Sequence, residues 1–138
     1  CNSFKKELLE GKHNFSQTSG DQFKLALYTN SASIGKSTTS FTTDNQVGAS
    51  GQYTSGGGKL AKGSQNTSVA TNTAIVDFAD RSFTGVTITA RGALIYNTSN
   101  SNSAVCVLDF GGDKTATAGT FTIQFPAFTT SAAIIRIS

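Results

Sequence analysis

The sequence predicts an all-β protein, a jelly-roll-like β-sandwich of about eight strands with a short N-terminal helix. Branched and aromatic residues, which fit a pleated surface, recur in short alternating runs. Gly, Asn, Ser and Thr separate these runs at the spacing of turns. Only one segment has the period of a helix, which favours a sandwich or jelly roll over strand–helix–strand units.

The length and composition bound the organisation of the chain. With 138 residues it forms one domain, 1–138, made of a helical segment over 1–12 and a β-sandwich over 22–138. Charged residues make up only 14%, so the surface polarity comes mainly from hydroxyl and amide groups. The 11 basic residues are scattered and no apolar run reaches membrane-spanning length. We therefore expect neither a nucleic acid nor a membrane as a partner.

The helical segment stands at the beginning of the chain. Asn2 or Ser3 is predicted to cap a helix that continues to Glu10, and Gly11 is predicted to stop it. Its apolar side consists of Phe4, Leu8 and Leu9. A helix this short is unstable alone in water, so we expect it to dock, first on its own domain and second on a partner.

The first strand is predicted at 23–28. Alternation places Phe23, Leu25 and Leu27 on a buried face and Lys24, Ala26 and Tyr28 on a partly wet one. Residues 29–51 are rich in Ser, Thr, Asn and Gly, which predicts long loops or weak edge strands. A turn at 56–58 follows.

Six further strands are predicted in the second half of the chain. They cover 73–78, 86–90, 93–96, 104–110, 120–125 and 133–137. Turns are expected at 80–85 and 111–113, and residues 97–103 are expected to close a hairpin. Pro126 ends the fifth of these strands because it cannot donate to a ladder.

Residues for catalysis or metal binding are sparse. His13 is the only imidazole, and its polar loop predicts an ordinary surface turn residue. Cys106 lies in an apolar run, where a thiol behaves as a small hydrophobe. Removal of an initiator Met explains Cys1 as well as a lipid anchor does. One His and two distant Cys do not make a zinc site, so no metal or cofactor is expected.

Other candidate sites have simpler interpretations. The pairs Asp77 with Asp80 and Asp109 with Asp113 lack the full pattern of a calcium loop and are interpreted as solvated turn carboxylates. No pair of carboxylates recommends itself for glycoside hydrolysis, so we expect no enzyme. Five side chains could form an aromatic and cationic platform for sugars or single-stranded nucleic acid, but packing in the core and rim of a β-sandwich explains them more simply. They are Tyr28, Tyr53, Tyr96, Arg81 and Arg91.

Four segments resemble a family of small virion proteins of tailed bacteriophages. These segments are 2–11, 23–29, 88–97 and 107–111. Within that group the chain is most similar to the capsid cement, or decoration, proteins. The resemblance implies a jelly roll, dimers on the outside of an icosahedral shell, and no enzymatic activity. The partner would be the major capsid protein and the location the outer capsid surface of the virion, after synthesis in the host cytoplasm.

The hypothesis that follows is a homodimer that clamps neighbouring capsid subunits. Contacts are expected from the N-terminal segment and from the loops at 38–52 and 56–65. The candidate contact residues are Phe4, Lys5, Lys6, Leu8, Leu9, Lys12, Phe41, Tyr53 and Lys59. The alternative is a receptor- or glycan-binding module, either in a tail fibre or on a bacterial surface lipoprotein anchored through Cys1. Loop aromatics such as Tyr53 would then bind the sugar.

Overall fold

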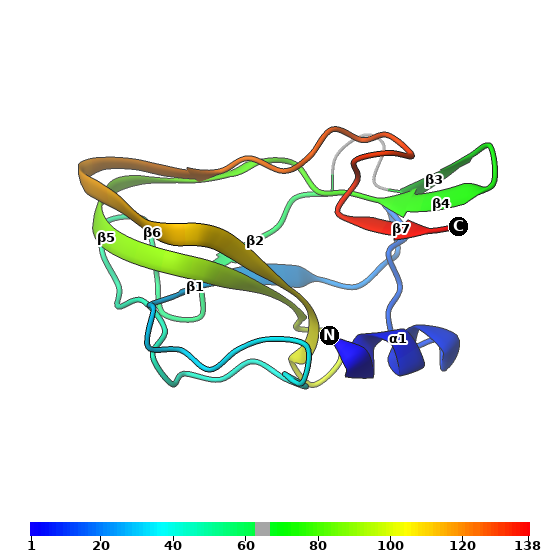
Figure 1. Ribbon diagram of the computed structural model, residues 1–138, viewed down its shortest axis with the longest axis horizontal. Helices are drawn as coiled ribbons and strands as arrows, with labels where there is room; N and C mark the ends of the chain where they lie inside the picture. Colours follow the sequence, from blue (N-terminus) through cyan, green and yellow to red (C-terminus); the bar gives the residue numbers. More distant parts are fainter. Residues whose placement is uncertain (63–66) are drawn as a thin grey trace.

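The computed structural model describes residues 1–62 and 67–138 and is mostly β, with 46% strand and 6% helix (Figure 1). The helix is α1, Asn2–Leu9. The strands of the described chain are β1 (Phe23–Tyr28), β2 (Gly58–Lys59), β3 (Thr67–Ala70), β4 (Thr73–Val76), β5 (Arg81–Asn97), β6 (Ser103–Ile123) and β7 (Ile135–Ile137). The predicted all-β class with a short N-terminal helix is confirmed. The described residues form seven strands, where the sequence predicts about eight.

Helix α1 ends close to where the sequence predicts, but it begins differently. Glu10 is its C-cap and Gly11 follows, as expected. The predicted side-chain cap is wrong, since Cys1 occupies the N-cap and makes no capping hydrogen bond with its side chain. The Asn2 amide instead donates to the carbonyl oxygen of Lys36 at 2.8 Å. The start of the helix is therefore held by the loop after β1.

The strands form two antiparallel sheets. The larger has the order β2-β1-β5-β6, and the smaller has the order β3-β4-β7. Strand β1 lies inside the larger sheet and pairs along its whole length with β5, from Phe23 opposite Asn97 to Tyr28 opposite Gly92. This position explains why β1 is apolar nearly throughout.

Both faces of β1 are covered. Phe23, Leu25 and Leu27 face the main core, as predicted. The second face is wet only at Lys24, which is half-buried, because Ala26 and Tyr28 are buried in a second, smaller cluster. Ala32, Ile34 and Phe41 of the loop between β1 and β2 pack against this face. The same loop also bonds to the edge of β1, where the Val47 amide donates to the carbonyl oxygen of Leu27 at 2.8 Å.

Strands β5 and β6 make one long hairpin. The turn predicted at 97–103 is confirmed at its centre. The turn predicted at 80–85 is misplaced, because the break between β4 and β5 lies at 77–80 and residues 81–85 belong to β5. The turn predicted at 111–113 is wrong, because these residues continue β6. Gly85 and Gly111 have φ values of 63° and 76°, and the ladder shifts register between Phe83 and Val86 and between Ala90 and Gly92. Irregularities of this kind bend a strand without ending it.

The bend of this hairpin encloses the core. Figure 1 shows the β5–β6 ribbon curving at one end of the molecule, so that its two halves lie in different layers. Ile95 from one half and Phe83 and Phe121 from the other belong to the same buried cluster. The smaller sheet and α1 lie together at the opposite end, with β7 facing the helix (Figure 1).

Candidate binding surface

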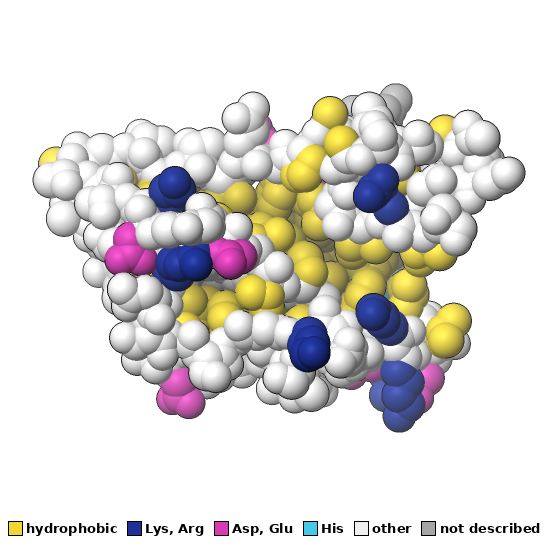
Figure 2. Space-filling model, in the orientation of Figure 1, with side chains coloured by type: hydrophobic (Ala, Val, Ile, Leu, Met, Phe, Trp, Pro, Cys, Tyr) yellow, Lys and Arg dark blue, Asp and Glu magenta, His cyan; other side chains and the backbone are white. Residues whose placement is uncertain are grey.

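An apolar groove lies between α1 and β7. Its volume is about 430 Å³. The lining consists of Cys1, Phe4, Lys5, Leu8, Leu9, Val105, Cys106, Ile134, Ile135, Arg136 and Ile137. A second groove of about 440 Å³ follows β6 and is lined by Phe110, Lys114, Thr115 and residues 120–124. Figure 2 shows hydrophobic side chains gathered in a hollow across this face of the molecule. We call the two grooves together the apolar cleft.

Two of the most exposed large hydrophobic residues of the described chain line the groove beside α1, and a third lies on the adjoining small sheet. They are Leu9, Val69 and Ile137, with exposed fractions of 91%, 70% and 52%. Val69 and Ile137 both pair with Ala74, from opposite sides, so the two side chains share one face of the small sheet. Leu9 and Ile137 line the same groove. Contiguous apolar surface of this kind is typical of interaction sites.

The charges on the lining of the cleft have one sign. Lys5, Lys114 and Arg136 belong to it, and neither groove is lined by an acidic residue in the described chain. Arg136 donates one hydrogen bond, from Nη1 to the carbonyl oxygen of Thr130 at 3.0 Å. None of the three cations pairs with a carboxylate among the described residues. The groove beside α1 is thus mainly apolar, the groove along β6 mixes apolar and polar side chains, and the charged residues on both linings are cationic.

Cys106 lies on β6 within the cleft. Burial raises the pKa of its thiol to about 11, so the group stays protonated near neutral pH. The interpretation of this residue as a small hydrophobe fits its surroundings, which are the apolar side chains of the groove.

Helix α1 is positioned by a buried polar chain. His13 Nε2 lies 2.9 Å from Glu7 Oε2, and its Nδ1 lies 3.1 Å from Asn97 Nδ2. The same amide nitrogen donates to Asp21 Oδ2 at 2.7 Å. The expectation that His13 is a surface turn residue is wrong, because its side chain is fully buried. It also contacts the ring of Phe4, with centroids 5.0 Å apart.

The candidate contact residues separate into two groups. Four line the cleft, namely Phe4, Lys5, Leu8 and Leu9. Lys6 and Lys12 instead lie 3.3 Å and 2.8 Å from Glu10, and the hydrogen bonds from Lys12 and Lys6 lower the pKa of that exposed carboxyl. Lys59 is exposed on β2, the strand at the far edge of the sheet from β6.

Phe41 and Tyr53 lie away from the cleft. The Phe41 ring is half-buried and stacks on Tyr96, with centroids 4.7 Å apart. Tyr53 has no exposed surface, which overturns its assignment as a contact residue. Its oxygen accepts a hydrogen bond from the Leu27 amide at 2.8 Å, and burial raises its pKa to about 12. Its position between a polar loop and the glycines at 56–58 gave no indication that the ring turns inward.

The structure does not assemble an aromatic platform. Tyr28 and Tyr96 are buried, and their hydroxyls donate to the carbonyl oxygens of Thr42 and Gly56 at 2.6 Å each. Arg81 lies over the ring of Phe83, 4.8 Å from its centroid. These side chains hold the long loop against the sheet, as the packing interpretation predicts.

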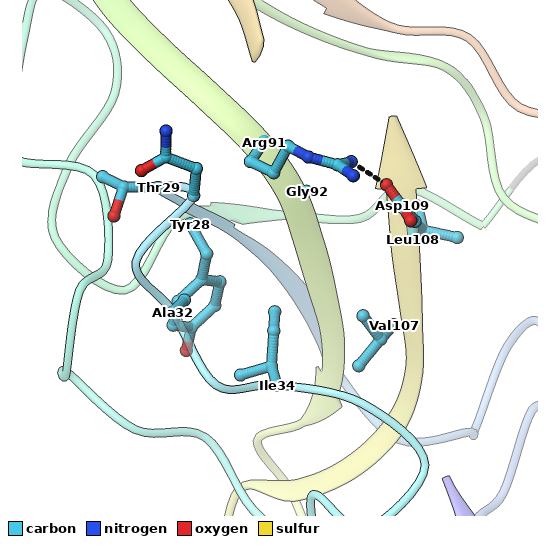
Figure 3. A pocket seen from close by; sticks show the side chains of 10 residues that line it. Tyr28, Thr29, Ala32, Ile34, Arg91, Gly92, Val107, Leu108 and Asp109 are labelled. Atoms are coloured by element: carbon cyan, nitrogen blue, oxygen red, sulfur yellow. Dashed lines mark hydrogen bonds and ion pairs between the residues drawn. The ribbon is translucent and has the colours of Figure 1, made fainter. Parts of the chain in front are cut away.

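Arg91 lies at a small polar pocket of about 230 Å³ on the other side of β6 from the main core (Figure 3). It forms an ion pair with Asp109. The hydrogen bond from the Gly111 amide lowers the pKa of Asp109 most, and the hydrogen bond from Arg91 lowers it further. Asp113 accepts a hydrogen bond from Asn30 at 3.2 Å. These carboxylates therefore have protein partners and are not simply solvated.

Asp77 and Asp80 each accept a hydrogen bond from a backbone amide. Asp77 Oδ1 accepts from the Phe78 amide at 2.9 Å and Asp80 Oδ1 accepts from the Phe125 amide at 2.8 Å. Asp77 is buried, and this burial raises its pKa. Across residues 1–62 and 67–138, no group of three or more His, Cys, Asp or Glu side chains is placed to hold a metal ion.

Sequence reasoning missed the β6 and β7 side of the cleft. Cys106, Ile135 and Ile137 were not among the candidate contacts, although the run at 133–137 predicts a strand. The alternation of that run could have indicated that part of it faces outward. The loop segments proposed as contacts, 38–52 and 56–62, lie outside the cleft lining, and residues 63–65 lie outside the described part of the chain.

Comparison with family models, curated proteins and solved structures finds no match. Among the described residues, no helix has the length and apolar character needed to cross a bilayer.

Proposed function

We propose that the protein is a structural virion protein that binds the outside of an icosahedral phage capsid and cements neighbouring major capsid protein subunits. The observation that carries this proposal is the apolar cleft, with Leu9 and Ile137 exposed on its lining and Val69 exposed on the same face of the small sheet as Ile137. A surface of this kind suits adhesion to another protein. The resemblance to capsid cement proteins supplies the identity of the partner.

The chemistry of the cleft favours a protein partner over a sugar. The groove beside α1 is lined mainly by Leu, Ile, Val and Phe side chains and offers few groups that could orient sugar hydroxyls, whereas the groove along β6 also carries Thr, Lys and Gln side chains. The glycan-binding alternative depends on a loop aromatic, and Tyr53 is buried in the core. No observation on the described residues favours a second function.

A cement protein stabilises a shell because it binds the assembled lattice and not the free subunits. The proposal includes a homodimer with two-fold symmetry and a jelly-roll relationship of the strands. Two linked binding surfaces raise the effective affinity roughly a hundredfold when the geometry lets both engage. Light scattering at micromolar concentration should then report a dimer, and a monomer would remove this part of the proposal.

Binding to capsids that lack the protein tests the function. The change is Leu9→Asp, which adds a charge to an almost fully exposed side chain and so leaves folding intact. We expect occupancy to fall about tenfold, because a carboxylate must be desolvated against apolar partner surface. The matched control is Thr84→Asp, at an exposed position on β5 away from the cleft.

Two results would contradict the proposal. The first is equal occupancy for the Leu9 and Thr84 variants. The second is a copy number of only a handful per particle in mass spectrometry of purified virions, which would indicate a tail component. A cement protein should be present in hundreds of copies.

A further inference from the structure

Cys1 and Cys106 lie close together in the fold although they are far apart in sequence. The backbone nitrogen of Cys1 donates to the carbonyl oxygen of Val105 at 3.1 Å, which places the beginning of α1 against the beginning of β6 (Figure 1). Both cysteines line the groove beside α1, pack against the main core and are free thiols.

The backbone hydrogen bond limits the distance between the two residues. Because the Cys1 nitrogen lies 3.1 Å from the carbonyl oxygen that precedes Cys106, standard bond lengths keep the two Cα atoms within about 7 Å of each other. Disulfides join Cα atoms that are usually about 4.4–6.8 Å apart. A bridge can therefore form without a large movement of the backbone.

The Cys1 thiol is held weakly in its present position. It lies 3.7 Å from the carbonyl oxygen of Gly35, and a thiol is a weak donor. Rotation about χ1 therefore carries the sulfur to another staggered position at small cost. Cys1 and Cys106 both keep some exposed surface on the groove, so a small reagent can reach them.

The charge of the Cys1 amine acts on the Cys106 thiol. Burial raises the pKa of this thiol to about 11, and the positive amine opposes part of that rise. A charge has this effect on a pKa when it lies near the titrating group. The electrostatics and the hydrogen bond to Val105 thus agree that the two cysteines are neighbours.

The beginning of α1 lacks a side-chain cap. Cys1 occupies the N-cap and makes no capping hydrogen bond with its side chain. Two backbone bonds hold this end of the helix, from Cys1 to Val105 and from Asn2 to Lys36. A covalent bond at Cys1 would hold the same end more firmly, because it does not open when the helix frays.

We propose that Cys1 and Cys106 form a disulfide bond when the protein meets an oxidising low-molecular-weight disulfide, and that this bond fastens the start of α1 to β6. The chemistry depends on the contacts above and needs no capsid. Its timing rests on the proposed function, because a virion protein is made in a reducing cytoplasm and later meets an oxidising exterior.

The reaction is a thiol–disulfide exchange in two steps. A thiolate of the protein attacks oxidised glutathione, forms a mixed disulfide and releases one glutathione. The other protein thiolate then attacks the sulfur of the first cysteine and releases the second glutathione. The two protein thiols lose two electrons and two protons, and these convert one oxidised glutathione into two thiols.

Peptide mapping of the full chain tests the inference. After incubation with oxidised glutathione in the absence of denaturant, we expect the mass of the intact chain to fall by about 2 Da, for the two hydrogen atoms lost. An unreduced tryptic digest should contain the peptide with Cys1 joined to the peptide with Cys106. Hydrogen exchange of the α1 amides should slow in the bridged protein.

Two single variants serve as controls. Cys1→Ser and Cys106→Ala each leave one thiol, so neither should show the mass decrease or the joined peptide. Because Cys106→Ala also removes a sulfur from the core, Cys1→Ser, at a half-buried position, is the variant that keeps the fold closest to the original. A mass decrease in either variant would overturn the assignment of the bridge.

The redox equilibrium shows whether the fold favours the bridge. The equilibrium constant with glutathione should be at least about 100-fold larger for the folded chain than for the chain in urea, because the fold already holds the two thiols together. Equal constants in buffer and in urea would contradict the inference. Disulfide-linked dimers on a non-reducing gel, in place of the intramolecular bridge, would contradict it as well.

The pH dependence of ring closure identifies the attacking thiol. We expect the mixed disulfide on Cys1, because the raised pKa of Cys106 keeps that thiol protonated. When the isolated mixed disulfide is transferred from acid to pH 7.5 or pH 9, closure should be about thirtyfold faster at pH 9, in proportion to the Cys106 thiolate. An increase below about tenfold would indicate a thiol of ordinary pKa in an opened chain and would overturn the role of the fold.

The outcomes of this test and of the capsid test are separable. Absence of the bridge in the purified chain removes the inference and leaves the capsid-binding experiment standing. Loss of capsid binding alone removes the reason for the timing and leaves the bridge itself.

Discussion

The hydroxyl of Tyr53 lies in the core, where its oxygen accepts a hydrogen bond from the Leu27 amide. Burial raises its pKa from 10.0 to about 12, and burial does the same for Tyr28. The folded state therefore holds these protons more tightly than the unfolded state. This contribution to stability is complete below pH 10 and is lost as pH rises from about 10 to about 12.

The Tyr53→Phe variant tests how much the raised pKa of Tyr53 contributes to the pH dependence of stability. The variant loses one buried hydrogen bond and should be less stable at pH 8 by about 1–3 kcal/mol. Between pH 9 and pH 11.5 its free energy of unfolding should fall less than that of the wild type, because one raised pKa has been removed. Urea unfolding at both pH values measures the difference, and parallel losses in the two proteins would contradict the expectation.

Asn97 is the centre of the buried polar chain that holds α1. Its amide nitrogen bonds to His13 and Asp21, and its oxygen accepts from the Ser99 amide at 2.9 Å. Asn97→Ala should lower the free energy of unfolding by about 2–3 kcal/mol, because buried polar groups lose their partners. Asn72→Ala, at an exposed turn position, should change it by less than about 0.5 kcal/mol. Equal losses of stability for the Asn97 and Asn72 variants in urea unfolding would show that the buried polar hydrogen bonds around Asn97 do not stabilise the fold.

At the scale of elements, β3 and β5 differ sharply in burial. All four residues of β3 are exposed, whereas the last six residues of β5 are all buried. Local opening is easiest where few buried contacts hold a strand. Hydrogen exchange with mass spectrometry should therefore show β3 amides exchanging far faster than those of β5 over 92–97. Comparable protection in both strands would contradict this.

The elements also show which local signals in the sequence are decisive. The helix ends where Gly11 predicts, and the hairpin around 98–102 forms where Asn and Ser cluster. Gly85 and Gly111 carry the same local signal, yet the chain bends there and continues. A glycine at a turn and a glycine at a bulge look alike in sequence, because both provide a positive φ. Cross-strand pairing decides between them, and pairing depends on residues far along the chain.

At the scale of the whole molecule, the sequence predicts the fold class better than the binding surface. The spacing of apolar residues shows which side of each element is apolar, so it predicts the core residues of β1 and the apolar side of α1. Whether an apolar residue faces the core or an open cleft depends on how the layers meet. Tyr53 and Ile137 show both outcomes, since one is fully buried and the other is half exposed.

The long β5–β6 hairpin has a consequence for the order in which the protein folds. Its ladder starts at the tight connection around 98–102 and lengthens by neighbouring pairs, so each step closes only a small additional loop. Strand β7 must instead reach β4 across about sixty intervening residues. We expect the hairpin to form early, with the joining of β4 and β7 as the slow final event.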